Sequence, residues 1–280
     1  TGIVMNMRSP PLDDLRIRQA LCHLYHRELL IEKLFYDAYA PLDSYFPDSP
    51  YTNGDNETIR YDPQRASELL ALAGWKHRDA AGYLVKDGQR LRLELLYSSK
   101  VVERYLSVFQ DDCRKAGVEI RLQQLTRASR FQLTYGSRKF QLATQGWSGD
   151  LDPQPGSVWH SDLAGQPNNH NLAGFQSERV DALCRQLQEV SDRAERIALL
   201  REIDGLIFAQ HPCILGWYSG YVRLAYWNKF GHPRKLLPRT AGAESVLRTW
   251  WIDEAKATAL QEAKRDSSIN LDPGPREVQY

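Results

Sequence analysis

Between residues 91 and 147 the sequence alternates between short apolar segments and longer segments whose apolar residues recur at helical spacing. Parallel strands cannot be joined by a tight hairpin, because each must be reached by a crossover, usually a helix. The pattern therefore predicts an α/β fold whose sheet is built from crossover units. The expected strands cover residues 91–99, 118–125 and 139–147, and the expected helices cover 101–117 and 129–137.

The flanking segments add further elements to this sheet. "TGIVMNM" at the start reads as a strand, and the acids of "RSPPLDD" are expected to cap a helix that begins near Leu15. Asp62, Pro63 and Gly74 are typical of the cap, first position and stop of a helix. Residues 39–63 lack any periodicity and hold several prolines, so they predict a long irregular loop. Further helices are expected at 177–191 and 192–210, and a strand at 213–220.

Charge and hydropathy exclude two classes of partner. The chain has 280 residues and a net charge of +1, so it has no broad positive field for nucleic acid. Eighteen consecutive apolar residues occur nowhere, so direct association with a membrane is not expected. The first residues lack the basic start and apolar middle of a signal peptide. We therefore expect the sequence to be the middle and end of a longer protein.

The four cysteines are expected to be small buried hydrophobic residues. They are far apart, contain no CxxC pair and have no histidine spacing typical of zinc, so a structural metal site is not predicted. Each lies in an apolar segment, which favours burial as a free thiol, although one disulfide stays open. The residues are Cys22, Cys113, Cys184 and Cys213.

The loop "QGWSGDLDPQPGSVWHSD", residues 145–162, is the candidate functional site. It follows the predicted strand 139–147, and ligands of open α/β sheets bind beyond the carboxyl ends of strands. It carries Asp150 and Asp152 one residue apart, with Trp147 and Trp159 on either side. Two acids between indole rings suggest chemistry, a metal or a positively charged ligand.

Four interpretations of the two acids remain open from the residues alone. A hydrolase would need both acids and His160 in one active centre, and a metal site would need the same three side chains to converge. Alternatively, Asp150 or Asp152 caps a helix near "PGSVW". The fourth interpretation requires the fewest residues to come together: one desolvated carboxylate beside an indole ring binds an ammonium group. We favour it for Asp150, and the capping interpretation for Asp152.

Three ordered motifs resemble family 5 of the extracytoplasmic solute-binding proteins, which serve ABC importers of oligopeptides, dipeptides and nickel. "VMNMRSPPLDDLRIRQALCHLYHRELL" is similar to the signature of that family, "YDPQRASELLALAGW" to its second hallmark, and "QGWSGDLDP" to the loop of its ligand-binding lobe. "WYSGYVRLAYWNKFGHPRKL" and "TWWIDEAKATAL" resemble the branch associated with oligopeptides and the antibiotic microcin C.

The resemblance implies the second lobe of a two-lobe, type II periplasmic binding protein, with a segment of the first lobe. It divides the chain into a hinge strand from the first lobe (1–14), the ligand-binding second lobe (15–215) and a return segment to the first lobe (216–260). The polar, proline-broken residues 261–280 are expected to form a largely disordered tail. It also implies a periplasmic location, with the signal peptide and most of the first lobe upstream of this chain.

The resemblance further implies a binding protein rather than an enzyme. No cofactor is expected, and the residues predict no metal site. The ligand would be a peptide or peptide-like compound, although a non-peptide cargo stays open, and the protein partners would be the subunits of an ABC permease. Asp150 matches the family residue that pairs with the α-amino group of the ligand, and Asp152 would shape the loop. The candidate ligand-binding residues are Gln145, Trp147, Ser148, Asp150, Trp159 and Asn169.

Overall fold

A computed structural model of the chain describes residues 1–149, 152–221, 223–233 and 243–272. The chain divides into two compact units. Unit 1 comprises Thr1–Ser148 and Asp152–Ser219, and unit 2 holds the remaining residues. The boundary after Ser219 lies close to the expected end of the second lobe at residue 215, while residues 1–14 belong to unit 1. How the segments divide between the lobes of a larger protein stays a prediction.

A five-stranded sheet forms the centre of unit 1, in the order β7-β6-β8-β1-β9. β6 is parallel to both β7 and β8, which confirms the predicted crossover units and the α/β class. β1 lies between β8 and β9 and is antiparallel to both. The strands are β1 (Gly2–Met5), β6 (Arg92–Tyr97), β7 (Glu119–Gln124), β8 (Leu142–Gln145) and β9 (Cys213–Leu215).

Strand direction brings several chain segments to one edge of this sheet, which we call the carboxyl edge. Tyr97 and Gln124, the last residues of β6 and β7, are paired in register. Gly2 pairs with Gln145 at the end of β8 and with Leu215 at the end of β9. The loops that follow four strands therefore begin at the same edge, where β1 starts.

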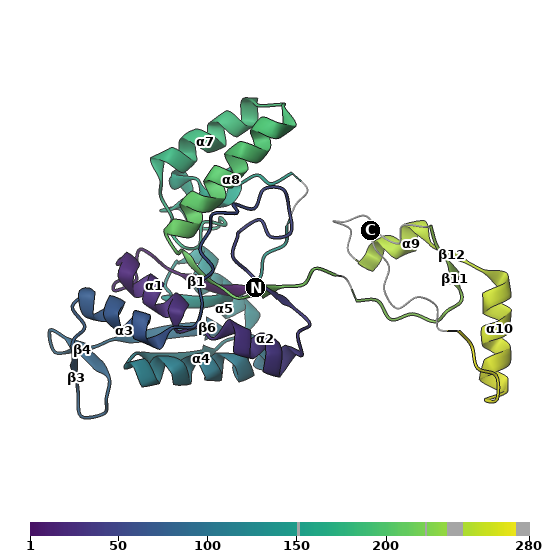
Figure 1. Ribbon diagram of the computed structural model, residues 1–280, viewed down its shortest axis with the longest axis horizontal. Coiled ribbons are helices and arrows are strands. Elements are labelled where there is room, and N and C mark those ends of the chain that lie inside the picture. The colour runs from purple at the N-terminus through teal and green to yellow at the C-terminus, as the bar shows by residue number, and fades with distance from the viewer. Residues whose placement is uncertain (150–151, 222, 234–242, 273–280) are drawn as a thin grey trace. The chain divides into compact units, whose positions relative to one another are not determined.

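Helices cover both faces of the sheet. Figure 1 shows α7 and α8 on one side and α3 and α4 on the other. Each side has its own apolar core: one is centred on Leu93 and Phe109, the other on Phe175 and Leu200. The helices of unit 1 are α1 (Leu15–His23), α2 (Arg27–Phe35), α3 (Pro63–Leu72), α4 (Glu103–Ala116), α5 (Arg127–Phe131), α6 (Gly156–Trp159), α7 (Glu178–Glu189) and α8 (Arg193–Ala209), with short turns η1 (Lys100–Val102), η2 (Gln132–Gly136) and η3 (Ser161–Leu163).

Local capping chemistry sets several of these helix ends as predicted. The Asp14 side chain accepts a hydrogen bond from the Arg16 N–H at the start of α1. Asp62 accepts from the Arg65 N–H at the start of α3, and Pro63 is the first helical residue. Gly74 follows α3 with a φ of 94°, a conformation that glycine adopts without steric cost.

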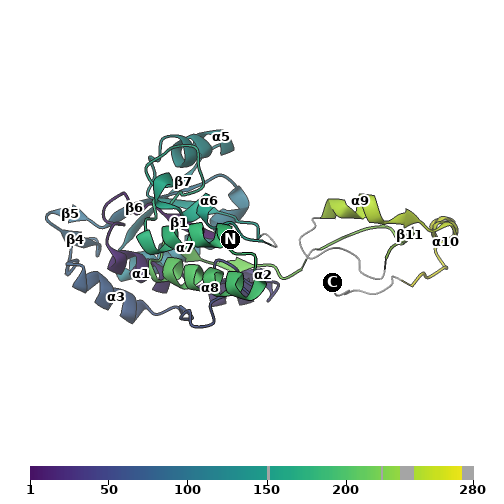
Figure 2. The same ribbon diagram turned by 90° about the horizontal axis from the view of Figure 1, so that it is seen from above.

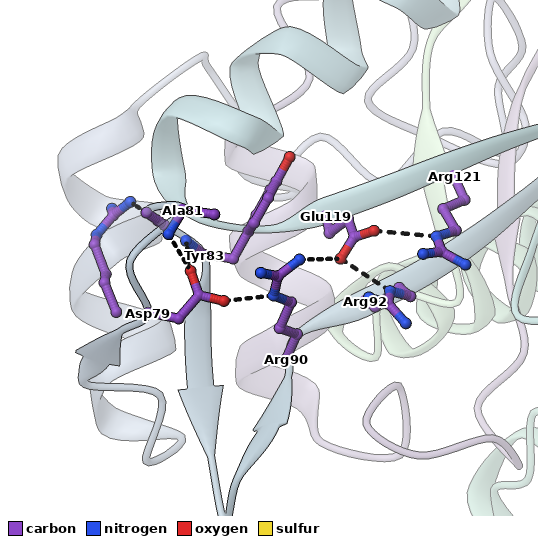
Figure 3. A network of polar contacts seen from close by, with 9 residues as sticks. Asp79, Ala81, Tyr83, Arg90, Arg92, Glu119 and Arg121 are labelled. Atoms are coloured by element: carbon purple, nitrogen blue, oxygen red, sulfur yellow. Dashed lines mark hydrogen bonds and ion pairs between the residues drawn. The ribbon is translucent and has the colours of Figure 1, made fainter.

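A small three-stranded sheet lies at the amino end of the main strands. It consists of β3 (His77–Arg78), β4 (Leu84–Lys86) and β5 (Gln89–Arg90), and Figures 1 and 2 both place it at the end of unit 1 away from the N-terminus. Figure 3 shows the ion pairs beside it. Glu119 accepts from Arg92 Nε at 2.9 Å and from Arg121 Nε at 3.0 Å, while Arg90 links Glu119 to Asp79.

The predicted helix over residues 129–137 is only partly present. Thr126 caps α5, its Oγ1 accepting from the Ser129 N–H at 3.1 Å, but α5 ends at Phe131. The chain then continues in η2, a turn of π-helix from Gln132 to Gly136. Single π turns interrupt α-helices and often occur at functional sites.

The long irregular loop after α2 is confirmed, and a buried carboxylate holds it. Within it β2 (Ala40–Pro41) pairs with β10 (Trp217–Tyr218). Asp204 of α8 accepts from the backbone N–H groups of Tyr45 and Asn53, at 2.8 and 2.9 Å. The predicted burial of the cysteines is confirmed as well: Cys22, Cys113, Cys184 and Cys213 are free and buried.

Unit 2 is small and exposes large apolar side chains. Trp227, Trp251 and Ile252 are each more than half exposed. Within the part of the chain that the structure describes, no helix is long and apolar enough to cross a membrane. The elements of unit 2 are β11 (Phe230–Gly231), η4 (Ala243–Ser245), α9 (Val246–Thr249), β12 (Trp251–Ile252) and α10 (Glu254–Arg265).

The end of α10 differs from the expected boundary of the tail. The tail is expected from residue 261, whereas α10 continues to Arg265. Its Asp253 cap, which accepts from the Lys256 N–H at 3.1 Å, and its run of good helix formers stabilise the helix locally. Residues 273–280 of the expected tail lie outside the described residues.

Candidate ligand-binding site

Exposed apolar side chains follow three of the strands that end at the carboxyl edge of the sheet. Val101, Phe131 and Trp147 follow β6, β7 and β8, and they are 68%, 53% and 41% exposed. Because these three strands are parallel, the segments that carry the side chains leave the sheet at the same edge. Ligands of open α/β sheets bind beyond the carboxyl ends of parallel strands, where apolar side chains can contact them. This edge is therefore the candidate site.

Trp147 lies directly over the start of β1. A Cβ atom added to Gly2 would lie 3.3 Å from Cζ3 of Trp147 and 2.3 Å from the carbonyl oxygen of Ile214. Only glycine allows this close approach of the two strands and the indole ring. Ser148 is exposed next to Trp147. Asp150, the expected anchor for an amino group, lies outside the described residues.

Gln145 connects the end of β8 to an aromatic pair. Its Nε2 donates to the hydroxyl of Tyr135 at 3.3 Å. The ring of Tyr135 stacks on Phe131, with centroids 4.7 Å apart and planes 11° apart, and meets His170 edge to face. We call Phe131 and Tyr135 the aromatic ledge.

Arg130 ties the ledge to the sheet. Its Nη1 donates to the carbonyl oxygen of Thr144 in β8 at 2.9 Å, so α5 is held beside the strand end. Its Nε is buried and makes no hydrogen bond within the described residues. Two hydrogen bonds thus connect the segment that carries the aromatic ledge to β8: one from Gln145 to Tyr135 and one from Arg130 to Thr144.

Two other candidate residues have structural partners in unit 1. Trp159 is 7% exposed and packs edge to face against Tyr45 and Phe175, so its ring belongs to the core beneath α7 and α8. Asn169 organises its own loop: its amide donates to the carbonyl oxygens of Leu163 and Gln166. The structure therefore places Gln145, Trp147 and Ser148 together at the carboxyl edge, and gives Trp159 and Asn169 other contacts.

The prediction that Asp152 caps a helix is wrong. α6 begins after Pro155 without a side-chain cap, and the Asp152 carboxylate instead pairs with Arg196 of α8 at 2.5 Å. Because an arginine is available from α8, the acid gains an ion pair that a capping bond to a four-residue helix would not give. Asp152 thus ties the loop to α8.

Two of the three residues that the hydrolase and metal interpretations need, Asp152 and His160, have separate partners, and the third, Asp150, lies outside the described residues. Asp152 is paired with Arg196, whereas His160 Nδ1 accepts a hydrogen bond from the Asp162 N–H at 3.3 Å. Among the described residues, no three or more His, Cys, Asp and Glu side chains form a group suited to a metal ion. The described geometry supports a surface for binding.

Sequence reasoning missed Phe131, Tyr135 and Arg130. The aromatic residues stand four apart in "RFQLTYGS", a spacing that places side chains on one face of a helix. That segment also follows a predicted parallel strand, so its start lies at the carboxyl edge. Together the two signals could identify the ledge, whereas the apolar period alone predicts only a helix over residues 129–137.

Comparisons with known proteins show which family the chain matches. The model of the family described as "Bacterial extracellular solute-binding proteins, family 5 Middle" matches residues 1–169, more than half of the chain. The "Probable peptide-binding protein YejA" of Agrobacterium fabrum is 24% identical over 91% of this chain and 46% of its own length. The chain spans about half the length of the curated relatives it matches.

Solved structures share the fold at low sequence identity. The oligopeptide-binding protein AppA from Bacillus subtilis, in complex with a nonapeptide, superposes with a TM-score of 0.73 at 21% identity, over 90% of this chain and 50% of that one. NikZ from Campylobacter jejuni, in complex with Ni(L-His), gives a TM-score of 0.70 at 23% identity, over 78% and 44% of the two chains.

Proposed function

Because the chain belongs to family 5 of the bacterial extracellular solute-binding proteins, a family of binding proteins and not of enzymes, we propose that it captures peptides or peptide-like compounds for an ABC importer. The observation that carries this proposal is the carboxyl edge of unit 1. There, the exposed side chains of Phe131 and Trp147 flank Gln145 at the end of β8. Such an edge is where α/β proteins hold small ligands.

A peptide is the ligand class that the comparisons favour. The chain is similar to a protein named for peptide binding and to a structure that holds a nonapeptide. Other similar proteins are named for nickel or heme, so the family as a whole accepts different solutes. An exposed apolar edge without a described metal-ligating group suits a peptide better than a free metal ion.

Asp150 is our proposed anchor for the α-amino group of the ligand, flanked by Trp147 and Ser148. A carboxylate enclosed beside an indole ring attracts an ammonium group by charge and by cation–π contact. Asp152, paired with Arg196, would keep the shape of the loop. Trp159 and Asn169 would support the site from the core and from the neighbouring loop.

The whole protein would work outside the cytoplasm with a permease. We propose a periplasmic, two-lobe protein that encloses the ligand by lobe closure and delivers it to the permease subunits. The narrower relationship with the oligopeptide and microcin C branch depends on residues 217–260. Of these, 222 and 234–242 lie outside the described residues, and the branch stays a prediction.

Calorimetry on a four-way cycle tests the anchor in the natural full-length protein. The wild type and Asp150→Asn are each titrated with a peptide that has a free amino terminus and with its acetylated form. Removing one partner of a buried pair costs about 3 to 5 kcal/mol, so Asp150→Asn should weaken the free peptide by roughly a hundredfold to several thousandfold. The acetylated peptide should bind the wild type poorly and lose little more in the variant.

Asp152→Asn is the matched control, because it removes a neighbouring carboxylate whose partner is Arg196. It should change peptide affinity much less than Asp150→Asn. Equal weakening of free and acetylated peptides by Asp150→Asn would show that the residue supports the loop and does not bind the amine. Failure of the wild type to bind any peptide would refute the proposed function itself.

A further inference from the structure

We infer that the aromatic ledge, Phe131 on Tyr135, is the surface on which an aromatic side chain of the peptide packs, so that the site selects peptides containing such a side chain. This inference rests on the proposed function and specifies the ligand class further. It concerns side chains of unit 1 that the described structure places at the carboxyl edge. The amine anchor at Asp150 is not part of the argument.

The ring of Phe131 lies outside the two apolar cores of unit 1. It stacks on Tyr135, with planes 11° apart, and the residue is still 53% exposed. A flat apolar surface held in water beside a binding edge gains free energy when a ligand covers it.

Contacts within unit 1 hold the ledge in place. The Tyr135 hydroxyl accepts from Gln145 Nε2, and its backbone carbonyl oxygen accepts from the Asn168 N–H at 2.7 Å. His170 packs edge to face against the Tyr135 ring at 5.9 Å. On the other side, Arg130 binds the Thr144 carbonyl oxygen. Because all these contacts are made between residues of unit 1, packing a ligand ring on the ledge should cost little entropy in ordering it.

An aromatic ring is the ligand group that fits this surface. Offset-stacked rings gain about two- to tenfold in affinity beyond the effect of the apolar area alone. An aliphatic side chain would cover area but would not stack, and a metal ion would have no ligand on a phenyl ring. The flat shape and the fixed orientation of Phe131 therefore favour Phe, Tyr or Trp in the peptide.

The test compares the affinities of peptides that differ in a single side chain. Tripeptides in which Phe or cyclohexylalanine replaces Ala at each position in turn are titrated calorimetrically into the natural full-length protein. The two replacements have similar apolar area, but only Phe is aromatic. We expect Phe at one position to bind at least about threefold more tightly than cyclohexylalanine. Phe131→Ala and Phe131→Leu should both remove this preference, while the all-Ala peptide still binds.

Leu72→Ala is the matched control variant. Leu72 is 64% exposed, and the end of α3 that carries it is bonded to the small sheet through Lys86, away from the carboxyl edge. It should leave the preference unchanged. If the wild type binds tripeptides without preferring Phe, or if Phe131→Ala keeps the preference, the inference is wrong and the proposed function stands. If no tripeptide binds the wild type, the inference is wrong, and the proposed function fails as well only if longer peptides also do not bind.

Discussion

His211 turns the chain from α8 into β9 with a left-handed backbone, at a φ of 47°. Its ring lies 5.7 Å from that of Phe208. Burial, together with the nearby charges of Arg18 and His23, lowers the pKa of His211 to about 4. The same ring has a pKa near 6.5 in an unfolded chain, so its protonation opposes folding.

This shift predicts that the chain loses stability as the pH falls from about 6.5 to about 4, because the unfolded state binds a proton that the folded state does not. We expect His211 to account for about 2 to 3 kcal/mol of the loss, reduced by its partial exposure. Denaturant unfolding across this pH range measures it. His211→Asn, which tolerates the left-handed backbone, should flatten the dependence, whereas the exposed His77→Asn should not. Equal slopes in all three proteins would contradict the prediction.

At the scale of an element, the buried carboxylate of Asp204 connects the long loop after α2 to α8. It is fully buried, and burial raises its pKa. Its oxygens accept two backbone N–H groups and the side-chain amide of Asn56 at 3.0 Å. The long loop after α2 has little other regular structure, so this carboxylate is its main connection to α8.

Asp204→Ala should lower the free energy of unfolding by about 2 to 4 kcal/mol, because two buried backbone N–H groups lose their acceptor. Denaturant titration measures the loss, and limited proteolysis should show earlier cleavage in residues 42–58. Glu202→Gln on the same helix is the control: it removes an exposed pair with Arg179 and should cost less than about 1 kcal/mol. A similar cost for both variants would mean that the loop is held by other contacts.

Gly117 joins α4 to β7 and sets where the crossover ends. Its φ is 93°, and a Cβ there would lie 2.8 Å from Arg78 Nη1 and 2.9 Å from Cγ of the buried Leu84. Gly88, in the small sheet, has a φ of 74° but open space around it. Both glycines therefore have a left-handed backbone, but only Gly117 has neighbouring atoms where a Cβ would lie.

Gly117→Ala should destabilise the chain by at least about 1 kcal/mol more than Gly88→Ala, since both variants incur left-handed strain but only the first one meets neighbouring atoms. Thermal or denaturant unfolding of the two single variants gives this difference directly. Equal losses would indicate that Leu84 and Arg78 move aside without cost.

At the scale of the whole molecule, the chain spans about half the length of its relatives, from 43% to 48% of three curated proteins to which it is similar. Unit 2 exposes Trp227, Trp251 and Ile252. If ligand is enclosed between two lobes, as we propose, one lobe supplies only part of the contacts and of the desolvation.

This chain alone should therefore bind peptide with a dissociation constant on the order of a hundredfold or more above that of the natural full-length protein. Calorimetry with the same peptide and both proteins provides the comparison. Equally tight binding by the two would contradict the proposal that lobe closure encloses the ligand.

The sequence by itself determined the main helices and strands of unit 1 and the edge of the sheet where we place the candidate site. The caps at Asp14 and Asp62, the stop at Gly74 and the apolar periods of the crossover units all depend on residues close in the chain. The carboxyl edge followed from strand order, because a crossover makes strands parallel. These features were predictable because local hydrogen bonding and side-chain period need no distant partner.

Only the tertiary structure decided which distant residues meet. Asp152 was predicted to cap the next helix, but Arg196, 44 residues away, provides its partner. β1 lies between β8 and β9, and Gln145 binds Tyr135, contacts that no local pattern in the sequence encodes. The physical reason is that such contacts depend on how whole elements pack over their shared cores, which fixes the side chains that come within hydrogen-bonding or stacking distance.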